Sequence, residues 1–432
     1  MRHDGAVKQV SANSVPAALA GRGQETAAEL AGKYARAFSG DGARVFIQLA
    51  YFYLVANTLT IAEFGLFATA SSVGIVLSRL AGFGFLSPLY RIATVKPQLI
   101  GAYTGGYIAA VLVSLPVVAL VGWAAYAGLF AGAMPVAAFA LIVATEVLLW
   151  RTLEVVINVN KGLERFGRAS IVIVFGFSVK ALAALVLALS PAPDLMSWAQ
   201  IYFVAQALMA VAAIALFYPR LRLRLPWHLF GRRIRDALAV CGAEILFYLQ
   251  NELDKLIVLS FGGPVAAGLY AIVMRLVDLT AMPVRTFSTI LTQRLMRRPQ
   301  LLESVRMRAA FEAGIFTLST MGFLAMAVVF ALKPDILGDN VARAAPFLLA
   351  VLFVPALRNL IEYQAELLYG RGQTVTRLVL YAIVGALKAV LMTALLMRGL
   401  APEAWMMWIN AVFALLYAVS FTVTYRAMAR PA

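Results

Sequence analysis

The sequence has few of the side chains on which most metal and acid–base chemistry depends. Its 432 residues include one cysteine, Cys241, and two histidines, His3 and His228. A single cysteine excludes an intramolecular disulfide and a cysteine-based metal site. Neither histidine lies in an apolar segment, and the chain contains no Asp-Asp pair and no Walker motif for nucleotide phosphates. We therefore expect a protein that is not an enzyme and that holds no metal and no cofactor.

Charge is also scarce. Charged residues make up 13% of the chain, whereas an average soluble protein has about 25%. Hydrophobic residues make up 62% and the mean hydropathy is +0.84, which predicts a protein with many membrane spans. The net charge of +16 does not indicate a nucleic-acid partner, because the basic residues are spread over short loops rather than gathered on a soluble surface.

Twelve apolar segments are long enough to cross a bilayer as helices, so the predicted fold class is all-α and integral to the membrane. No apolar run precedes Val45, and residues 1–43 are therefore expected to be a cytoplasmic tail rather than a secretory signal peptide. The expected spans cover residues 44–61, 64–86, 101–124, 130–150, 169–190, 197–217, 237–260, 265–291, 309–332, 344–368, 374–397 and 403–425.

Lysine and arginine predict the orientation of these spans. Of the 37 basic residues, only Lys333, Arg343 and Arg398 fall in segments that are outside when the N-terminus is inside, and the others lie in cytoplasmic segments or at membrane depth. The largest basic group is the linker PRLRLRLPWHLFGRRIR, from Pro219 to Arg235. The positive-inside rule therefore places this linker and both termini in the cytoplasm. Contact of the linker with anionic lipid headgroups is a second reading of the same residues.

The linker divides the chain into two halves that repeat each other. The run from Glu63 to Ala68 (EFGLFA) aligns with AAGLYA at an offset of 203, and Lys180 aligns with Lys388 at an offset of 208. An even number of spans in each unit makes the repeats parallel, about an axis along the membrane normal. The expected units are a six-helix lobe at 44–218, a basic linker at 219–236, a second six-helix lobe at 237–425 and a cytoplasmic tail at 426–432.

The stretch from Ala239 to Thr292 has the most charge at membrane depth. It contains two apolar spans joined by a Gly-Gly-Pro turn, with seven charged residues inside the spans. Ionisable groups in a bilayer usually face a bundle interior or a wet cavity and mark a transport path. The spacing of Glu252 and Lys255, and of Arg275 and Asp278, also allows purely structural pairs. Two such pairs would use only four of the seven charges.

These residues carry a family resemblance. The run DKLIVLSFGGPVAAGLYAIVMRLVDLTAMPV resembles the seventh-to-eighth helix segment of bacterial polysaccharide flippases, the Wzx-like O-antigen flippases of the MOP superfamily. EFGLFATASSVGIVLSRLAGFGFLSPLYRIA resembles their second helix, and KGLERFGRAS their loop between helices four and five. The resemblance covers most of residues 44–425. It implies a MATE-like fold with two lobes around a central, often cationic cavity. It also implies alternating access and export of an isoprenoid pyrophosphate-linked oligosaccharide across the inner membrane.

Basic residues at membrane depth are the candidates to bind the pyrophosphate, because Arg offers bidentate contacts and Lys a point charge. Acidic residues at that depth are equally numerous, so many of these groups must form structural pairs. The substrate-binding candidates are Arg79, Arg151, Lys180, Lys255, Arg275, Arg285, Arg358 and Lys388. Arg79, Lys180, Arg285 and Lys388 are the stronger ones, because no acid lies three or four residues away. Asp254, Glu252 and Asp278 are the candidates to couple transport to a gradient.

Other functions share some of these features. An ion-coupled multidrug antiporter would have the same twelve helices, but eight buried basic groups disfavour a cationic cargo. A membrane glycan polymerase or ligase usually needs a large outer loop, and the longest one expected here lies near residues 333–343. Buried charge at this density would also be a poor way to build a scaffold. We expect a monomer in the bacterial inner membrane, whose partners are a lipid-linked anionic glycan, membrane lipids and H⁺ or Na⁺ as coupling ion.

Overall fold

The computed structural model of the protein describes residues 44–224, 227–297 and 304–429, apart from the side chains of 227–230, 232–233 and most of 282–297. The expected tail at 1–43 lies outside this range, as do parts of the linker and of the C-terminal tail. The described chain is helical and contains no β-strand. Within it, nine helices are long and apolar enough to cross a membrane, or ten if one bent pair counts as a single span. The chain is a multi-pass membrane protein, and the count of twelve spans stays a prediction.

The N-terminal half begins with helical residues 44–58. Short connections join the helices that follow. Two π-helical turns, at Tyr126–Phe130 and Thr145–Trp150, extend the third and interrupt the fourth of the expected spans. The helices are α2 (Ile61–Leu80), α3 (Leu86–Val95), α4 (Ile100–Ala125), α5 (Val136–Ala144), α6 (Arg151–Gly162), α7 (Phe166–Ala188) and α8 (Leu195–Phe217).

The C-terminal half begins with the long α9 (Trp227–Arg297), which contains the two expected spans of the central stretch. Its one non-helical residue is Gly263, with φ 75° and ψ −178°, a conformation that essentially only glycine adopts. The predicted turn between the seventh and eighth spans therefore lies where the Gly-Gly-Pro motif indicated. The remaining helices are α10 (Val305–Leu332), α11 (Asp339–Ala344), α12 (Pro346–Ala350), α13 (Val354–Gly370), α14 (Thr374–Leu396) and α15 (Pro402–Met428).

Three expected spans have different bounds in the structure. The second ends at Leu80 rather than at residue 86, because the following turn has positive φ at Gly82, Phe83 and Gly84. The fourth was expected at 130–150, but helical structure starts at Val136 and continues through α6. The tenth is broken: α11 and α12 meet α13 at an angle of 72°.

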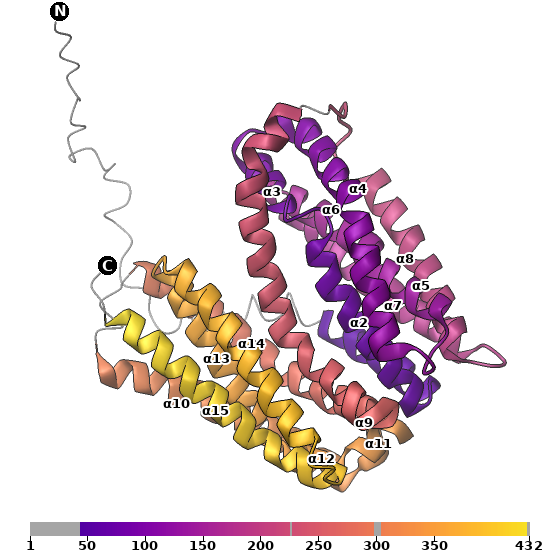
Figure 1. The fold of residues 1–432 in the computed structure, drawn as a ribbon, viewed down its shortest axis with the longest axis vertical. Coiled ribbons are helices and arrows are strands. Elements are labelled where there is room, and N and C mark those ends of the chain that lie inside the picture. The colour runs from indigo at the N-terminus through magenta and orange to yellow at the C-terminus, as the bar shows by residue number, and fades with distance from the viewer. Residues whose placement is uncertain (1–43, 225–226, 298–303, 430–432) are drawn as a thin grey trace, which may run out of the picture.

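The helices form two lobes (Figure 1). The ribbons of the lobes lie farthest apart at the end where α9 begins and α15 ends, and they converge where α2 meets α9. The first part of α9 runs between the lobes. Near its start, Cys241 bonds to a carbonyl of α2, and further along Phe247 packs on Tyr381 of α14. This helix therefore links the two halves along much of its length.

The backbones of α2 and α9 approach each other closely at two glycines. A Cβ atom on Gly65 would meet backbone atoms of Pro264 and Gly268, and one on Gly268 would meet the carbonyl of Ile61. Gly65 and Gly268 are the residues that the repeat aligns at an offset of 203. Such a contact between equivalent residues is expected beside an axis that relates two halves. The crossing therefore agrees with the predicted duplication.

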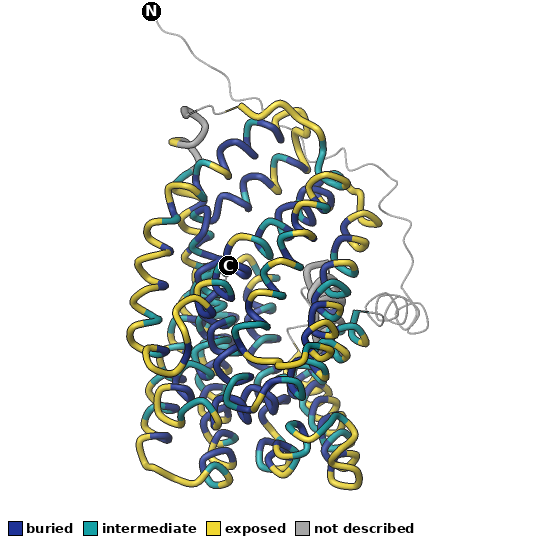
Figure 2. Tube along the Cα trace, turned by 90° about the vertical axis from the view of Figure 1, so that its right-hand side faces the viewer, coloured by how far each residue is buried: buried dark blue, intermediate teal, exposed yellow. Residues whose placement is uncertain are grey.

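The outer surface is apolar, as a bilayer requires. Exposed residues follow the outer faces of the peripheral helices, whereas buried residues gather inside (Figure 2). Leu112, Trp123, Leu182 and Leu208 are each more than half exposed, although a soluble protein would bury such large side chains. The polar residues lie instead in the interior, where the site is built.

Candidate functional site

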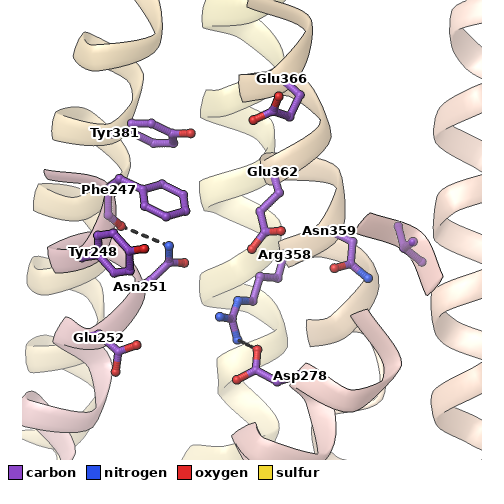
Figure 3. A pocket seen from close by; sticks show the side chains of 11 residues that line it. Phe247, Tyr248, Asn251, Glu252, Asp278, Arg358, Asn359, Glu362, Glu366 and Tyr381 are labelled. Carbon is purple, nitrogen blue, oxygen red and sulfur yellow. Dashed lines mark hydrogen bonds and ion pairs between the residues drawn. The ribbon is translucent and has the colours of Figure 1, made fainter. Parts of the chain in front are cut away.

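A cavity of about 450 Å³ lies between the first part of α9 and helices α13 and α14 of the C-terminal half. Its side chains come from segments distant in sequence and point toward a common space (Figure 3). Acids and aromatic rings dominate the lining. The lining residues are Phe247, Tyr248, Asn251, Glu252, Asp278, Val284, Arg358, Asn359, Glu362, Glu366 and Tyr381.

The α13 helix contributes the largest group of charges to this cavity. Arg358, Glu362 and Glu366 follow each other at intervals of four residues, so they share one helix face, as their spacing predicts. Arg358 forms an ion pair of 3.0 Å with Asp278 of α9. Glu366 forms one of 2.6 Å with Arg377 of α14. The cavity wall is thus held together by ion pairs between helices.

A second cluster connects the N-terminal lobe with the start of α9. Both guanidinium nitrogens of Arg79 donate to Glu154, at 2.9 and 2.8 Å. Arg151 donates to Glu154 at 2.6 Å and to Glu244 of α9 at 3.2 Å. The guanidinium of Arg79 also lies 4.2 Å from the ring centre of Tyr248. The acid partner of Arg79 is on another helix, where local spacing could not reveal it.

In several of these pairs the carboxylate is more exposed than the cation. Arg151 is 2% exposed and its partner Glu244 is 33% exposed. Arg358 is 14% exposed and its partner Asp278 is 26% exposed. The space between the helices therefore contacts carboxylates more than guanidinium groups. Within the lining of the cavity itself, four acids face one arginine, a formal charge of 1 − 4 = −3.

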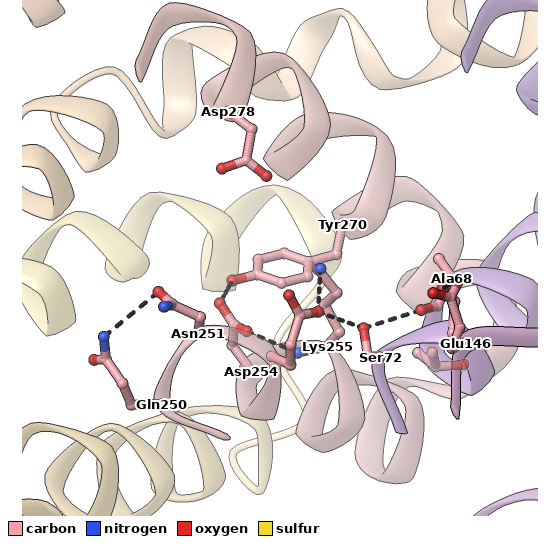
Figure 4. A network of polar contacts seen from close by, with 12 residues as sticks. Ala68, Ser72, Glu146, Gln250, Asn251, Asp254, Lys255, Tyr270 and Asp278 are labelled. Carbon is pink, nitrogen blue, oxygen red and sulfur yellow. Dashed lines mark hydrogen bonds and ion pairs between the residues drawn. The ribbon is translucent and has the colours of Figure 1, made fainter. Parts of the chain in front are cut away.

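A polar network links the two halves at the base of the cavity (Figure 4). Ser72 of α2 donates to Glu252 at 2.6 Å, and Lys255 donates to the same carboxylate at 2.6 Å. The predicted internal pair of Glu252 and Lys255 is therefore present. The other predicted pair is wrong, because Asp278 bonds to Arg358 and not to Arg275. Lys255 therefore forms a structural ion pair with Glu252.

Asp254 lies beside this network and is buried. It accepts a hydrogen bond of 2.7 Å from Tyr270 and lies 3.6 Å from Lys388. Lys388 also donates to the backbone carbonyl of Gln250. The predicted candidate Lys388 therefore has an acid partner on another helix. Both members of this pair are less than 5% exposed, so they lie behind the cavity wall rather than on its surface.

The repeat partner of Lys388 is surrounded differently. Lys180 is 8% exposed, and its ammonium lies 4.0 Å from the ring centre of Trp150 and 5.3 Å from that of Tyr202. Tyr202 donates to Glu146, an acid in the same lobe. Among the residues that the structure describes, neither Lys180 nor Arg275 forms an ion pair or hydrogen bond. The side chain of the remaining candidate, Arg285, is outside the described residues.

Sequence reasoning missed part of the cavity lining. Tyr381, Phe247 and Asn359 line it, but aromatic and amide side chains are too common in membrane helices to be singled out without a structure. In the described chain, no group of three or more His, Cys, Asp and Glu residues is arranged to hold a metal ion. The site can offer hydrogen-bond acceptors, aromatic faces and a few cations.

Comparison with known proteins identifies the fold. A multidrug resistance MATE family transporter of the MOP superfamily, in an inward-facing conformation, is 14% identical, with a TM-score of 0.71 over 88% of this chain and 93% of that chain. Such a transporter in an outward-facing conformation is 12% identical, with a TM-score of 0.59 over 91% and 94%. A MOP superfamily transporter from Pyrococcus furiosus is 15% identical, with a TM-score of 0.60 over 90% and 92%.

The reverse polarity of its binding pocket is reported to suggest a different function for that Pyrococcus furiosus protein. No protein-family model and no curated protein matches the present sequence. At these identities the comparison shows the fold alone. The chain has the fold of MATE transporters of the MOP superfamily.

Proposed function

We propose that this chain is an alternating-access transporter that moves an isoprenoid pyrophosphate-linked oligosaccharide across the bacterial inner membrane. The fold supports transport, and the cavity lining supports the class of cargo. Nine of the eleven lining residues carry a polar group: four acids, two Asn, two Tyr and one Arg. Sites for drug-sized lipophilic molecules are mostly apolar with few polar groups. This cavity has many more polar groups than such a site.

A glycan fits such a lining for a simple chemical reason. Sugar hydroxyls are hydrogen-bond donors, and an ionised carboxylate is an acceptor only. Glu252, Glu362 and Glu366 supply such acceptors, while Tyr248 and Tyr381 supply rings with an apolar face. The single observation that carries the proposal is the number of carboxylate acceptors beside aromatic rings at membrane depth, because a lipophilic cargo would use the rings but not the acceptors.

The pyrophosphate needs cations, and two predicted candidates remain available for it. Lys180 and Arg275 have no hydrogen-bonded acid partner among the described residues, unlike Arg79, Arg151 and Lys388. Because a buried cation without a partner is costly, an anionic ligand that reaches it gains strong charge-assisted bonds. We assign Lys180 and Arg275 to the pyrophosphate and the acidic cavity to the sugars.

A second candidate function is an ion-coupled multidrug antiporter. The observation in its favour is the formal charge of −3 on the cavity lining, which suits a cationic cargo. The sequence argument against it counted eight buried basic groups. That argument is weaker now, because five of them are held in ion pairs: Arg79, Arg151, Lys255, Arg358 and Lys388.

Vesicles that contain the purified protein separate the two functions. We expect lipid pyrophosphate-linked oligosaccharide to move to the opposite leaflet, measured by the access of an impermeant lectin, and a cationic dye not to be transported. Lys180→Met and Arg275→Gln should each reduce flipping at least tenfold, the effect of about 1.4 kcal/mol. The matched control is Arg371→Gln, because the Arg371 guanidinium donates to a carbonyl near the C-terminus. Dye transport without flipping would establish the antiporter instead.

A further inference from the structure

The C-terminal lobe holds a buried carboxylate outside the cavity. Glu312, two turns into α10, is 8% exposed. It accepts hydrogen bonds from the Gln364 amide at 3.0 Å, the Tyr417 hydroxyl at 2.7 Å and the Tyr425 hydroxyl at 2.8 Å. In the part of the chain that the structure describes, no Lys or Arg forms an ion pair with it. A carboxylate that is held only by neutral groups can exist with or without a proton.

The three acids predicted to couple a gradient are in a different position. Asp254 is paired with Lys388, Glu252 with Lys255 and Asp278 with Arg358. Protonation of any of these would leave a cation without its counter-charge in the membrane, which is strongly unfavourable. Protonation of Glu312 breaks no ion pair among the residues that the structure describes. The three acids predicted to couple a gradient are thus less suited to that role than Glu312.

Other groups around Glu312 have unused hydrogen-bonding capacity. The hydroxyls of Tyr363 on α13 and Thr424 on α15 are buried and have no partner among the described residues. Tyr363 adjoins Gln364, and Thr424 adjoins Tyr425. The guanidinium of Arg308 on α10 lies 5.6 Å from the ring centre of Tyr425.

Among the described residues, the groups that titrate or carry charge around Glu312 are the three tyrosines and Arg308, and the described α9 side chains in this cluster are apolar. Unpartnered hydroxyls give the cluster room to rearrange when the carboxylate changes charge.

The cluster is connected to the cavity through α13. Gln364, which donates to Glu312, is on the same helix as Arg358 and Glu362 of the cavity wall. Asn359, also in that wall, donates to Ser319 of α10 at 3.0 Å. Two buried side-chain bonds therefore fix α13 against α10, and one of them ends on the titratable carboxylate.

We propose that Glu312 is a proton-binding site and that its protonation state shifts α13 against α10, so that a proton gradient drives the opening and closing of the cavity. The proton comes from water on one side of the membrane and returns to water on the other, and no other bond is made or broken. As far as cargo is concerned, this inference rests on the proposed function.

Infrared difference spectroscopy of the full-length protein tests proton binding without any cargo. Acidification should produce a carboxylic-acid band in the wild type that Glu312→Gln lacks and that Glu403→Gln, at an exposed site in the first turn of α15, retains. A band that is unchanged in Glu312→Gln overturns the proposal.

Transport in vesicles tests coupling. An imposed proton gradient should accelerate flipping by the wild type and by Glu403→Gln, whereas Glu312→Gln should flip at the rate seen without a gradient. A wild type that ignores the gradient, or a Glu312→Gln variant that still responds to it, overturns the coupling role. If no glycan lipid moves in any variant, the proposed cargo fails, and the infrared result still decides whether Glu312 binds a proton.

Discussion

At the scale of single residues, the aligned lysines have different surroundings and should respond differently to substitution. Lys388→Met would leave Asp254 buried without its cation, which costs about 3–5 kcal/mol. Lys180→Met removes no ion pair among the described residues, so its effect on stability should be smaller. Urea unfolding of the purified variants measures both free energies.

The double variant Asp254→Asn with Lys388→Met provides the control for this prediction. It removes both charges and should recover much of the lost stability, because no uncompensated charge remains. A Lys388→Met variant that unfolds at the same urea concentration as the wild type would show that the 3.6 Å pair carries no such energy.

The same residues show how far local spacing reaches. Glu252 and Lys255 are three residues apart on one helix, so their pair follows from helical geometry and was predictable. The partner of Arg79 is 75 residues away and that of Lys388 is on another helix. Such partners depend on which helices meet and at what depth, and neither a helix period nor a hydropathy profile contains that information.

At the scale of secondary-structure elements, the lobes are tied together opposite the end where their ribbons diverge. The amide of Asn57 donates to the carbonyl of Leu337 at 2.7 Å. The amide of Asn340 donates to the carbonyls of Ala56 and Leu59, both at 2.7 Å. These contacts join the end of the first helix of one half to α11 and the 3₁₀ turn Pro334–Leu337 of the other, and opening this end requires breaking them.

We predict that Asn340→Ala shifts the protein toward a conformation open at this end. Loss of the two hydrogen bonds that the Asn340 side chain donates, each worth about 1 kcal/mol, removes stabilisation that only the closed state has. Cysteines placed on the two sides of the contact should then crosslink more slowly than in the wild type. Asn410→Ala, which removes bonds within one lobe, is the control. Equal crosslinking in all three proteins would contradict this role.

The crossing of α2 and α9 sets a second prediction at this scale. Gly268→Val places a side chain against the backbone of α2, where neither helix is able to give way without separating the lobes. We expect little folded protein, measured by size-exclusion profile and yield. A Cβ atom on Gly322 of α10 would have no neighbour within 4 Å. Gly322→Val should therefore behave as the wild type apart from the different helix propensity of valine.

Helix positions were largely predictable and helix irregularities were not. The fifth, sixth, eleventh and twelfth expected spans agree with α7, α8, α14 and α15 to within three residues, because long apolar runs bounded by polar residues define them. The break before α13 was not foreseen. The largely apolar run of residues 344–368 predicts one continuous span, although Pro355 lies in the first turn of α13, a position typical of a helix start, directly after the 72° bend.

At the scale of the whole molecule, the end at which the lobes diverge can be compared with the distribution of lysine and arginine. The lobes diverge at the end where α9 begins and α15 ends, which the basic residues predict to be cytoplasmic. We therefore predict that the structure represents a state open to the cytoplasm.

Labelling of single cysteines tests that state directly. With Cys241→Ser as background, we expect a cysteine at Glu362 in the cavity wall to react with an impermeant thiol reagent in inside-out vesicles and not in intact cells freed of their outer membrane. A cysteine at Gly132, exposed in the turn after the third span, should show the reverse. An imposed proton gradient should raise the labelling of residue 362 from the outer side, because each 1.4 kcal/mol shifts the two populations about tenfold. Labelling of residue 362 only from the outer side would invert the orientation, and labelling of residues 132 and 362 from the same side would refute the expected topology.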